Sequence, residues 1–198
     1  MPKIDKAVIT ANAIELFKKH GYNNVTINDI CQSCCITKPT FYNYVNSKED
    51  LILDVYDHTI NNILHDTCLF IQAESHIEQL YMVFSSLIAD TLAMGWDLFS
   101  QLLISNLNQN RHSFDMRESL TDLCIIIIKK AQEKGEIHNM NSPQLIYQMI
   151  AYSFMGFETN WCIQNGSLNF VEPFFRGMNA ILLPDSQYDD CFLKYLSP

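Results

Sequence analysis

Two helix start signals, Thr26 and Thr37, lie only 11 residues apart in this chain, and they limit its fold more than any other feature. Thr26 is a candidate N-cap whose hydroxyl can accept a backbone N–H, and Asp29 can return the bond. Thr37 is a second candidate, and Pro39 falls in the first turn, where N–H groups lack partners within the helix. We therefore expect a helix-turn-helix, in which the second short helix enters the DNA major groove.

Ser47 is the candidate N-cap of a third helix. Glu49 and Asp50 would then occupy the first turn of that helix, where negative charge is favourable. The first 51 residues resemble the head of the TetR family of bacterial transcriptional repressors. That head has an apolar helix ending in Phe and Gly, a Thr-capped helix, a recognition helix rich in Thr and Tyr, and then Ser-Lys-Glu. The matching residues are Ile9, Ala13, Ile14, Leu16, Phe17, Gly21, Val25, Thr26, Ile27, Asp29, Ile30, Thr37, Lys38, Pro39, Thr40, Phe41, Tyr42, Ser47, Lys48 and Glu49. Beyond residue 51 the resemblance is architectural.

The resemblance implies an all-α fold of about nine helices, with a three-helix DNA-binding head in residues 1–48 and a helical effector-binding and dimerisation domain in residues 49–198. Periodicity and end signals predict helices over about residues 47–70, 77–94, 97–108 and 114–134. Another is predicted to begin at Pro143, after the N-cap Ser142, and the last to span about residues 170–183.

The total net charge of −9 argues against DNA binding, but its distribution along the chain does not. Residues 1–48 hold six Lys and three acidic residues, a net charge of +3. The rest of the chain holds the other 7 basic and 19 acidic residues, a net charge of −12. A basic head suits the phosphate backbone, and an acidic body disfavours non-specific wrapping of DNA.

The resemblance also assigns roles within the head. Contacts to phosphates, which set the register on DNA, are expected from Thr26, Thr40, Tyr42 and Lys48. Candidates for contacts to base edges are Asn28, Lys38, Pro39, Asn43 and Tyr44. Lys can donate to guanine acceptors, Asn can pair with adenine, and Pro can touch a thymine methyl. The alternative for each residue is an ordinary solvated side chain.

Three of the seven cysteines, Cys31, Cys34 and Cys35, cluster at the expected turn. The family usually has Ala-Gly where this chain has Cys34-Cys35, so Cys35 is expected to bear backbone strain or to mark a different turn. A metal site would need further ligands, which the neighbouring sequence lacks, and the preferred interpretation of Cys31 and Cys34 is small buried hydrophobes. Thiol-based sensing remains open.

The helix that begins at Pro143 has almost no polar face, and the last helix carries two apolar stripes. A helix that is apolar all round must be buried on both sides. These helices resemble the dimerising pair of the TetR family, although a deep core within one chain would give the same pattern. The expected interface residues are Phe154, Gly156, Phe157, Phe170, Phe174, Met178 and Ile181.

The family resemblance further implies a small effector bound within the C-terminal domain. The candidate contacts are His58, His65, Phe84, Trp96, Phe99 and Tyr152. The aromatic residues can equally be core residues, and the two histidines can equally lie on the surface. An effector that displaces the far end of the helix over residues 47–70 is expected to change the spacing of the two heads and release DNA.

The sequence contains no G-x-G-x-x-G, G-x-S-x-G, H-E-x-x-H or Walker pattern, so neither an enzyme nor a cofactor or metal ion is expected. The longest apolar run, residues 123–128, is far shorter than the roughly 18 residues of a membrane span. No signal-peptide pattern starts the chain, so a cytoplasmic location is expected.

These features predict a ligand-responsive transcriptional regulator, by resemblance a repressor. It would bind a palindromic operator in double-stranded DNA as a homodimer, and a small, largely apolar or aromatic effector would release it. The alternative is a DNA-binding regulator without such an effector, controlled by a partner protein or by cysteine oxidation.

Overall fold

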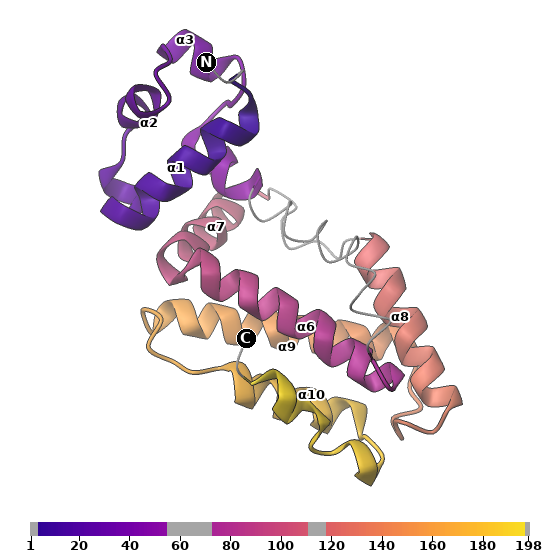
Figure 1. The fold of residues 1–198 in the computed structure, drawn as a ribbon. Coiled ribbons are helices and arrows are strands. Elements are labelled where there is room, and N and C mark those ends of the chain that lie inside the picture. The colour runs from indigo at the N-terminus through magenta and orange to yellow at the C-terminus, as the bar shows by residue number, and fades with distance from the viewer. Residues whose placement is uncertain (1–3, 55–72, 111–117, 197–198) are drawn as a thin grey trace. The chain divides into compact units, whose positions relative to one another are not determined.

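The computed structural model describes residues 4–54, 73–110 and 118–196. Regular structure in these residues is helical, apart from one isolated bridge between Ile137 and Pro184, so the predicted all-α fold is confirmed (Figure 1). The chain divides into two compact units. Unit 1 comprises Met1–Thr59 and Met94–Ser113, and unit 2 comprises Ile60–Ala93 and Phe114–Pro198.

Unit 1 begins with α1 (Lys6–His20), the 3-10 helix η1 (Tyr22–Asn24), α2 (Ile27–Ser33) and α3 (Lys38–Tyr42). Residues 48–54 are also helical, and α7 (Trp96–Asn108) completes the described part of the unit. Its core is apolar and includes Phe17, Ile30, Phe41 and Leu51, which are almost fully buried. The predicted linear boundary at residue 48 does not anticipate this grouping, because α7 is distant in sequence from α1–α3.

The three predicted helix caps of the head are confirmed. Thr26 caps α2 in a reciprocal capping box with Asp29, and the Thr37 side chain accepts the Thr40 N–H at the start of α3. The Ser47 hydroxyl accepts the Asp50 N–H at 3.2 Å, in the first turn of the helix over residues 48–54. The continuation of that helix to residue 70 lies outside the described residues.

Unit 2 contains α6 (His76–Met94, except its last residue), α8 (Glu118–Glu133), α9 (Pro143–Ile163) and α10 (Val171–Leu182). These bounds agree with the sequence predictions within a few residues, although the predicted start of α8 near residue 114 lies outside the described residues. The ring of Phe84 on α6 lies 5.7 Å from that of Phe154 on α9 and 5.3 Å from that of Phe174 on α10. The core of the unit is therefore built where α6, α9 and α10 run side by side (Figure 1).

Four predicted interface residues belong to this core instead. Phe154 is 8% exposed, Phe170 is 1% exposed, and Phe174 and Met178 are fully buried within a single chain. Their assignment to the surface of α9 and α10 is wrong, because a side chain covered by its own chain cannot contact a partner. Gly156 is exposed, and Phe157 and Ile181 are half-buried.

The exposed side of α9 is nevertheless apolar. Its large exposed side chains are Leu145, Met149, Tyr152 and Ile163, at 44%, 44%, 50% and 69% exposure. The exposed residues of α10 are Pro173, Arg176 and Ala180. Among the described helices none is by itself both long and apolar enough to cross a membrane, and α6 and α7 reach those values only as a bent pair.

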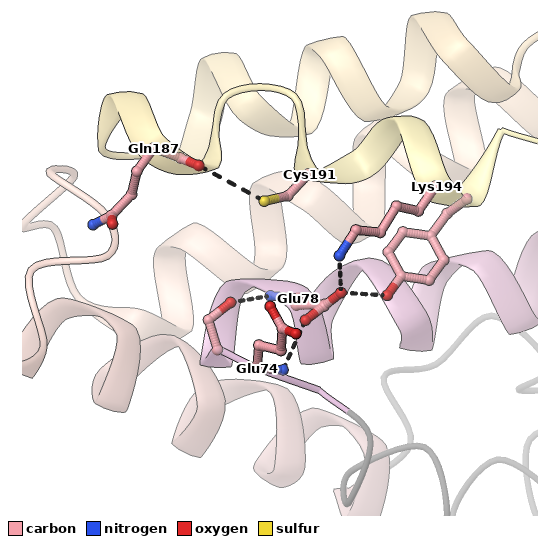
Figure 2. Close-up of polar contacts among 7 residues, drawn as sticks. Glu74, Glu78, Gln187, Cys191 and Lys194 are labelled. Atoms are coloured by element: carbon pink, nitrogen blue, oxygen red, sulfur yellow. Dashed lines mark hydrogen bonds and ion pairs between the residues drawn. The ribbon is translucent and has the colours of Figure 1, made fainter.

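The C-terminal segment after α10 folds back onto unit 2 as a strap, which we define as residues 184–196. It contains the 3-10 helices η2 (Ser186–Tyr188) and η3 (Cys191–Tyr195). The Glu78 carboxylate on α6 accepts hydrogen bonds from Lys194 Nζ at 3.0 Å and from the Tyr195 hydroxyl at 2.9 Å (Figure 2). Phe192 is 1% exposed and its ring stacks on Phe175 at 6.1 Å. Sequence reasoning assigned no role to this segment, which the structure makes part of the core.

Candidate nucleic-acid interface

The turn between α2 and α3 is tight and well bonded. The Ile36 N–H donates to the Cys31 carbonyl at 2.9 Å, and Cys35 adopts a φ of 53°, in the left-handed region that favours glycine. The expected strain at Cys35 is therefore present. Cys31 and Cys34 are buried as small hydrophobes, and burial raises the pKa of both thiols, which disfavours the reactive thiolate.

Most of the predicted DNA contacts are accessible. The exposed members of the set are Thr26, Asn28, Lys38, Pro39, Tyr42, Asn43 and Tyr44. Four of them lie on or directly after α3, whose opposite side buries Phe41 completely. Thr40 and Lys48 are half-buried. The short helix α3 therefore presents a polar and aromatic surface, with a single Lys, to the outside of unit 1.

Several of these side chains already have partners within the head. The Thr26 hydroxyl lies 2.6 Å from Asp29 Oδ2, and the Thr40 hydroxyl lies 2.9 Å from that of Thr37. The Tyr44 hydroxyl donates to the Ile4 carbonyl at 3.2 Å, at the N-terminal edge of α1. These bonds hold the side chains in place, while each hydroxyl oxygen keeps acceptor capacity.

Lys48 has an intramolecular role that sequence reasoning missed. Its ammonium donates to the carbonyl of Tyr22 at 2.8 Å and to that of Val25 at 3.0 Å, and it lies 3.8 Å from the centre of the Tyr22 ring. Burial lowers the pKa of Lys48, and the adjacent Glu49 carboxylate opposes this effect. Two of its three N–H groups serve the fold, so at most one remains for a phosphate.

The predicted effector contacts that the structure describes are divided between the two units. His58 and His65 lie outside the described residues. Phe84 is part of the aromatic core of unit 2, whereas Tyr152 is half exposed on α9. Trp96 and Phe99 belong to α7 in unit 1. Two cavities of unit 1, of about 590 and 230 Å³, contain none of these residues in their walls.

A buried carboxyl group in unit 2 was also missed. Glu158 on α9 is 2% exposed, and its Oε1 accepts a hydrogen bond from the Thr91 hydroxyl of α6 at 2.6 Å. Burial raises the pKa of Glu158 to about 8, against the opposing effect of the Thr91 bond. Glu158 is thus mainly a neutral acid at pH 7. The sequence gives no signal of this burial, because a carboxylate side chain on a helix is ordinarily interpreted as a surface residue.

Comparison with known proteins identifies the N-terminal part. Residues 9–55 match the family model described as bacterial regulatory proteins, tetR family. The chain is similar to the uncharacterized HTH-type transcriptional regulator YuxN of Bacillus subtilis (strain 168), with 37% identity over 67 residues, which are 32% of this chain and 23% of YuxN. It is also similar to DhaS of Lactococcus lactis, the HTH-type dhaKLM operon transcriptional activator, with 27% identity over 66 residues, 31% of this chain and 35% of DhaS. These matches span only about a quarter and a third of the two relatives.

Similarity of fold extends over most of the chain. The crystal structure of Thermus thermophilus FadR, a TetR family transcriptional repressor in complex with lauroyl-CoA, matches with a TM-score of 0.69 and 23% identity, over 89% of this chain and 93% of that one. FadR of Bacillus halodurans, a fatty acid degradation regulator, matches with a TM-score of 0.60 and 18% identity, over 88% and 96% of the two chains. At these identities the similarity concerns the fold.

Proposed function

Because this chain belongs to the tetR family of bacterial regulatory proteins, we propose that it is a transcription regulator that binds double-stranded DNA through α2 and α3. The observation that carries the proposal is α3 itself. Its N-cap, its proline and its buried Phe41 fix the helix on unit 1, and its other side exposes Lys38, Pro39 and Tyr42. This is the composition and the placement of a helix that enters the major groove.

Within this interface we assign two kinds of contact. Thr26, Thr40 and Tyr42 bind phosphates, and Lys48 contributes its remaining N–H there while it holds the fold of the head. The residues that face base edges are Asn28, Lys38, Pro39, Asn43 and Tyr44. Among them Lys38 donates to guanine. The basic charge of residues 1–48, at +3, supports the phosphate contacts.

The regulator acts as a homodimer, paired through the exposed sides of α9 and α10. An exposed row of Leu145, Met149 and Tyr152 on α9 supports this pairing, because such a row on a monomer would leave apolar surface in water. Gly156 continues the row and permits close approach of the partner backbone. A two-fold axis then places two α3 helices in successive major grooves when they lie about 34–36 Å apart.

The signal that releases DNA is a small, largely apolar or aromatic effector bound in the C-terminal domain, and the regulator is a repressor. The aromatic interior of unit 2 supports this class of ligand, and so does the lauroyl-CoA found in Thermus FadR, a protein of the same fold. Control by a partner protein or by cysteine oxidation remains the second candidate, favoured only by the exposed Cys35 in the turn of the helix-turn-helix.

The test is selection of DNA from a random-sequence library by the full chain. We expect enrichment of a palindrome whose half-sites lie about one helical turn apart. The Lys38→Ala variant should select DNA with a weaker base preference at one position of each half-site. The control Lys134→Ala, at an exposed position after α8, should select the same sequence as the wild type. Absence of any enriched sequence with the folded wild-type dimer would rule the proposal out.

A further inference from the structure

Each polar group of Tyr22 is hydrogen-bonded within unit 1, to Asp97 on α7 and to the adjacent residues Lys48 and Glu49. Its N–H donates to Asp97 Oδ2 at 3.3 Å, its carbonyl accepts from Lys48 Nζ at 2.8 Å, and its hydroxyl donates to Glu49 Oε1 at 3.0 Å. The ring lies 5.0 Å from that of Phe17, and the residue is 5% exposed. Burial and the neighbouring Glu49 carboxylate raise the pKa of Tyr22, so the hydroxyl stays a donor.

This residue stands directly before the DNA-binding helices. Tyr22 opens η1, Val25 closes it, and Thr26 is the N-cap of α2. Lys48 also binds the Val25 carbonyl, so this one ammonium holds the backbone that leads into α2 at Tyr22 and at Val25, while Glu49 holds the Tyr22 side chain. The Tyr22 N–H is held separately, by α7. The direction of α2, and of α3 attached to it by the tight turn, therefore depends on both sets of bonds.

The bond to Asp97 makes α7 part of the head. Asp97 lies in the first turn of α7, next to Leu98 and Phe99, which are 2% and 0% exposed. The chain enters α7 through Gly95, whose φ of 87° and ψ of 151° are open only to glycine without strain. A side chain at position 95 would meet no atom within 4 Å, so the backbone conformation alone requires glycine there. The entry to α7 is thus fixed by conformation.

We propose that α7 contributes to DNA binding although it lies far from α2 in the sequence. Asp97 is the positioning residue, because its bond to the Tyr22 N–H orients α2. Displacement of the first turn of α7 therefore lowers DNA affinity. The inference rests on the proposed function, because it requires that α2 and α3 bind DNA. It adds a second route by which a change in the C-terminal domain reaches the head. The first route is the helix predicted over residues 47–70, and the second is the chain connection from α6 into α7 through Gly95.

The first experiment compares Asp97→Ala with Asp97→Asn in the full chain, using the DNA sequence that the wild type enriches. Asp97→Ala removes the acceptor, so we expect about a tenfold loss of affinity, the equivalent of one hydrogen bond. Asn keeps an oxygen that can accept the Tyr22 N–H and should restore most of the affinity. Asp122→Ala, an exposed position on α8, is the control and should bind as the wild type does.

A structural readout separates positioning from general destabilisation. In Asp97→Ala, amide hydrogen exchange should accelerate at Tyr22 and in α2, while the exchange of α9 and α10 and the thermal midpoint of unit 2 stay unchanged. The salt dependence of binding should also stay unchanged, because no phosphate contact is removed.

The second experiment displaces α7 without touching Asp97. Gly95→Ala strains the entry to α7, and Gly135→Ala strains the turn after α8, where φ is 70° and a side chain again meets no atom within 4 Å. We expect Gly95→Ala to lower DNA affinity and Gly135→Ala to leave it unchanged. Wild-type affinity in both Asp97→Ala and Gly95→Ala would overturn the inference. If the wild type itself enriches no DNA sequence, the proposed function fails instead.

Discussion

Two buried glutamates of unit 2 differ in what their surroundings supply. Burial acts to raise the pKa of both. At Glu78, hydrogen bonds from the Glu74 N–H, Lys194 and Tyr195 outweigh burial, and the pKa falls below its usual range. At Glu158, the single hydrogen bond from Thr91 does not outweigh burial, and the pKa rises to about 8. The number of donors aimed at a carboxylate, more than its depth, decides its charge state.

Glu158 therefore predicts a pH dependence of stability. Its folded-state pKa is raised above the ordinary value of 4.5 for a Glu side chain, so its contribution to stability is complete below pH 4.5 and is lost as the pH rises through about 8. Within that window the free energy of unfolding should fall by up to about 1.4 kcal/mol per pH unit. Glu158→Gln, which keeps an acceptor for Thr91, should remove this slope in chemical denaturation, whereas the exposed Glu133→Gln should keep it. Parallel slopes in Glu158→Gln and the wild type would contradict the assignment.

Lys38 and Tyr42 lie on the same short helix but should affect DNA binding differently. Lys38→Ala should relax the preference at one base pair of each half-site by about 1–3 kcal/mol, because it removes a donor to a base edge. Tyr42→Phe should weaken binding to all sequences alike, because it removes a phosphate contact. Binding assays on the selected sequence and its single-base variants separate the two effects. A change of sequence preference in Tyr42→Phe would reverse the assigned roles.

At the scale of residues, the sequence predicted what local chemistry decides. The caps Thr26, Thr37 and Ser47 act within three residues of themselves, and the strain at Cys35 follows from a turn that usually contains glycine. Lys48 was predicted as a phosphate contact only, because its internal partners Tyr22 and Val25 lie 26 and 23 residues away. Partners so distant in sequence leave no local pattern.

The helices α9 and α10 illustrate the same limit at the scale of elements. Their extents were predicted, and so was the conclusion that α9 must be covered on two sides. The side that faces the core was not, because an all-round apolar helix has no polar stripe to mark it. Side chains such as Phe174 face inward, whereas the exposed side of α9 carries Leu145, Met149 and Tyr152.

The proposed dimer interface follows from that exposed side. Met149→Glu should place a charge in an apolar contact and shift the protein to monomer in light scattering, with little change in helix content. Phe174→Glu should instead unfold unit 2, because it buries an unpaired charge. Ile126→Glu, at an exposed position on α8, is the control for surface charge. A Met149→Glu dimer as tight as the wild type would exclude this face.

The strap also predicts a stability effect. Phe192→Ala should lower the free energy of unfolding by about 3–5 kcal/mol, because it removes a buried ring that contacts the rings of Tyr81 and Phe175. Leu193→Ala, at a neighbouring position that is 46% exposed, should change it by much less. Denaturant titrations of both variants measure the difference. Equal losses would mean that the strap does not belong to the cooperative core.

At the scale of the whole molecule, neither compact unit is one continuous stretch of the chain. Residues 94–113 group with the N-terminal residues, although residues 60–93 of unit 2 precede them in the chain. Sequence reasoning placed one boundary at residue 48, near the end of the 51 residues that resemble the family's head. The resemblance concerns a pattern of helices along the sequence, whereas the grouping depends on tertiary bonds such as that from the Tyr22 N–H to Asp97.

The bond between Tyr22 and Asp97 also bears on how such regulators can be recombined. A chimera that grafts residues 1–48 onto a foreign C-terminal domain would carry Tyr22 but leave Asp97 behind. The transplanted helix-turn-helix would then lie beside the α7 of another protein, without the Asp97 carboxylate that accepts the Tyr22 N–H. Exchange of operator specificity between relatives should therefore succeed more often when residues 94–113 travel with the head.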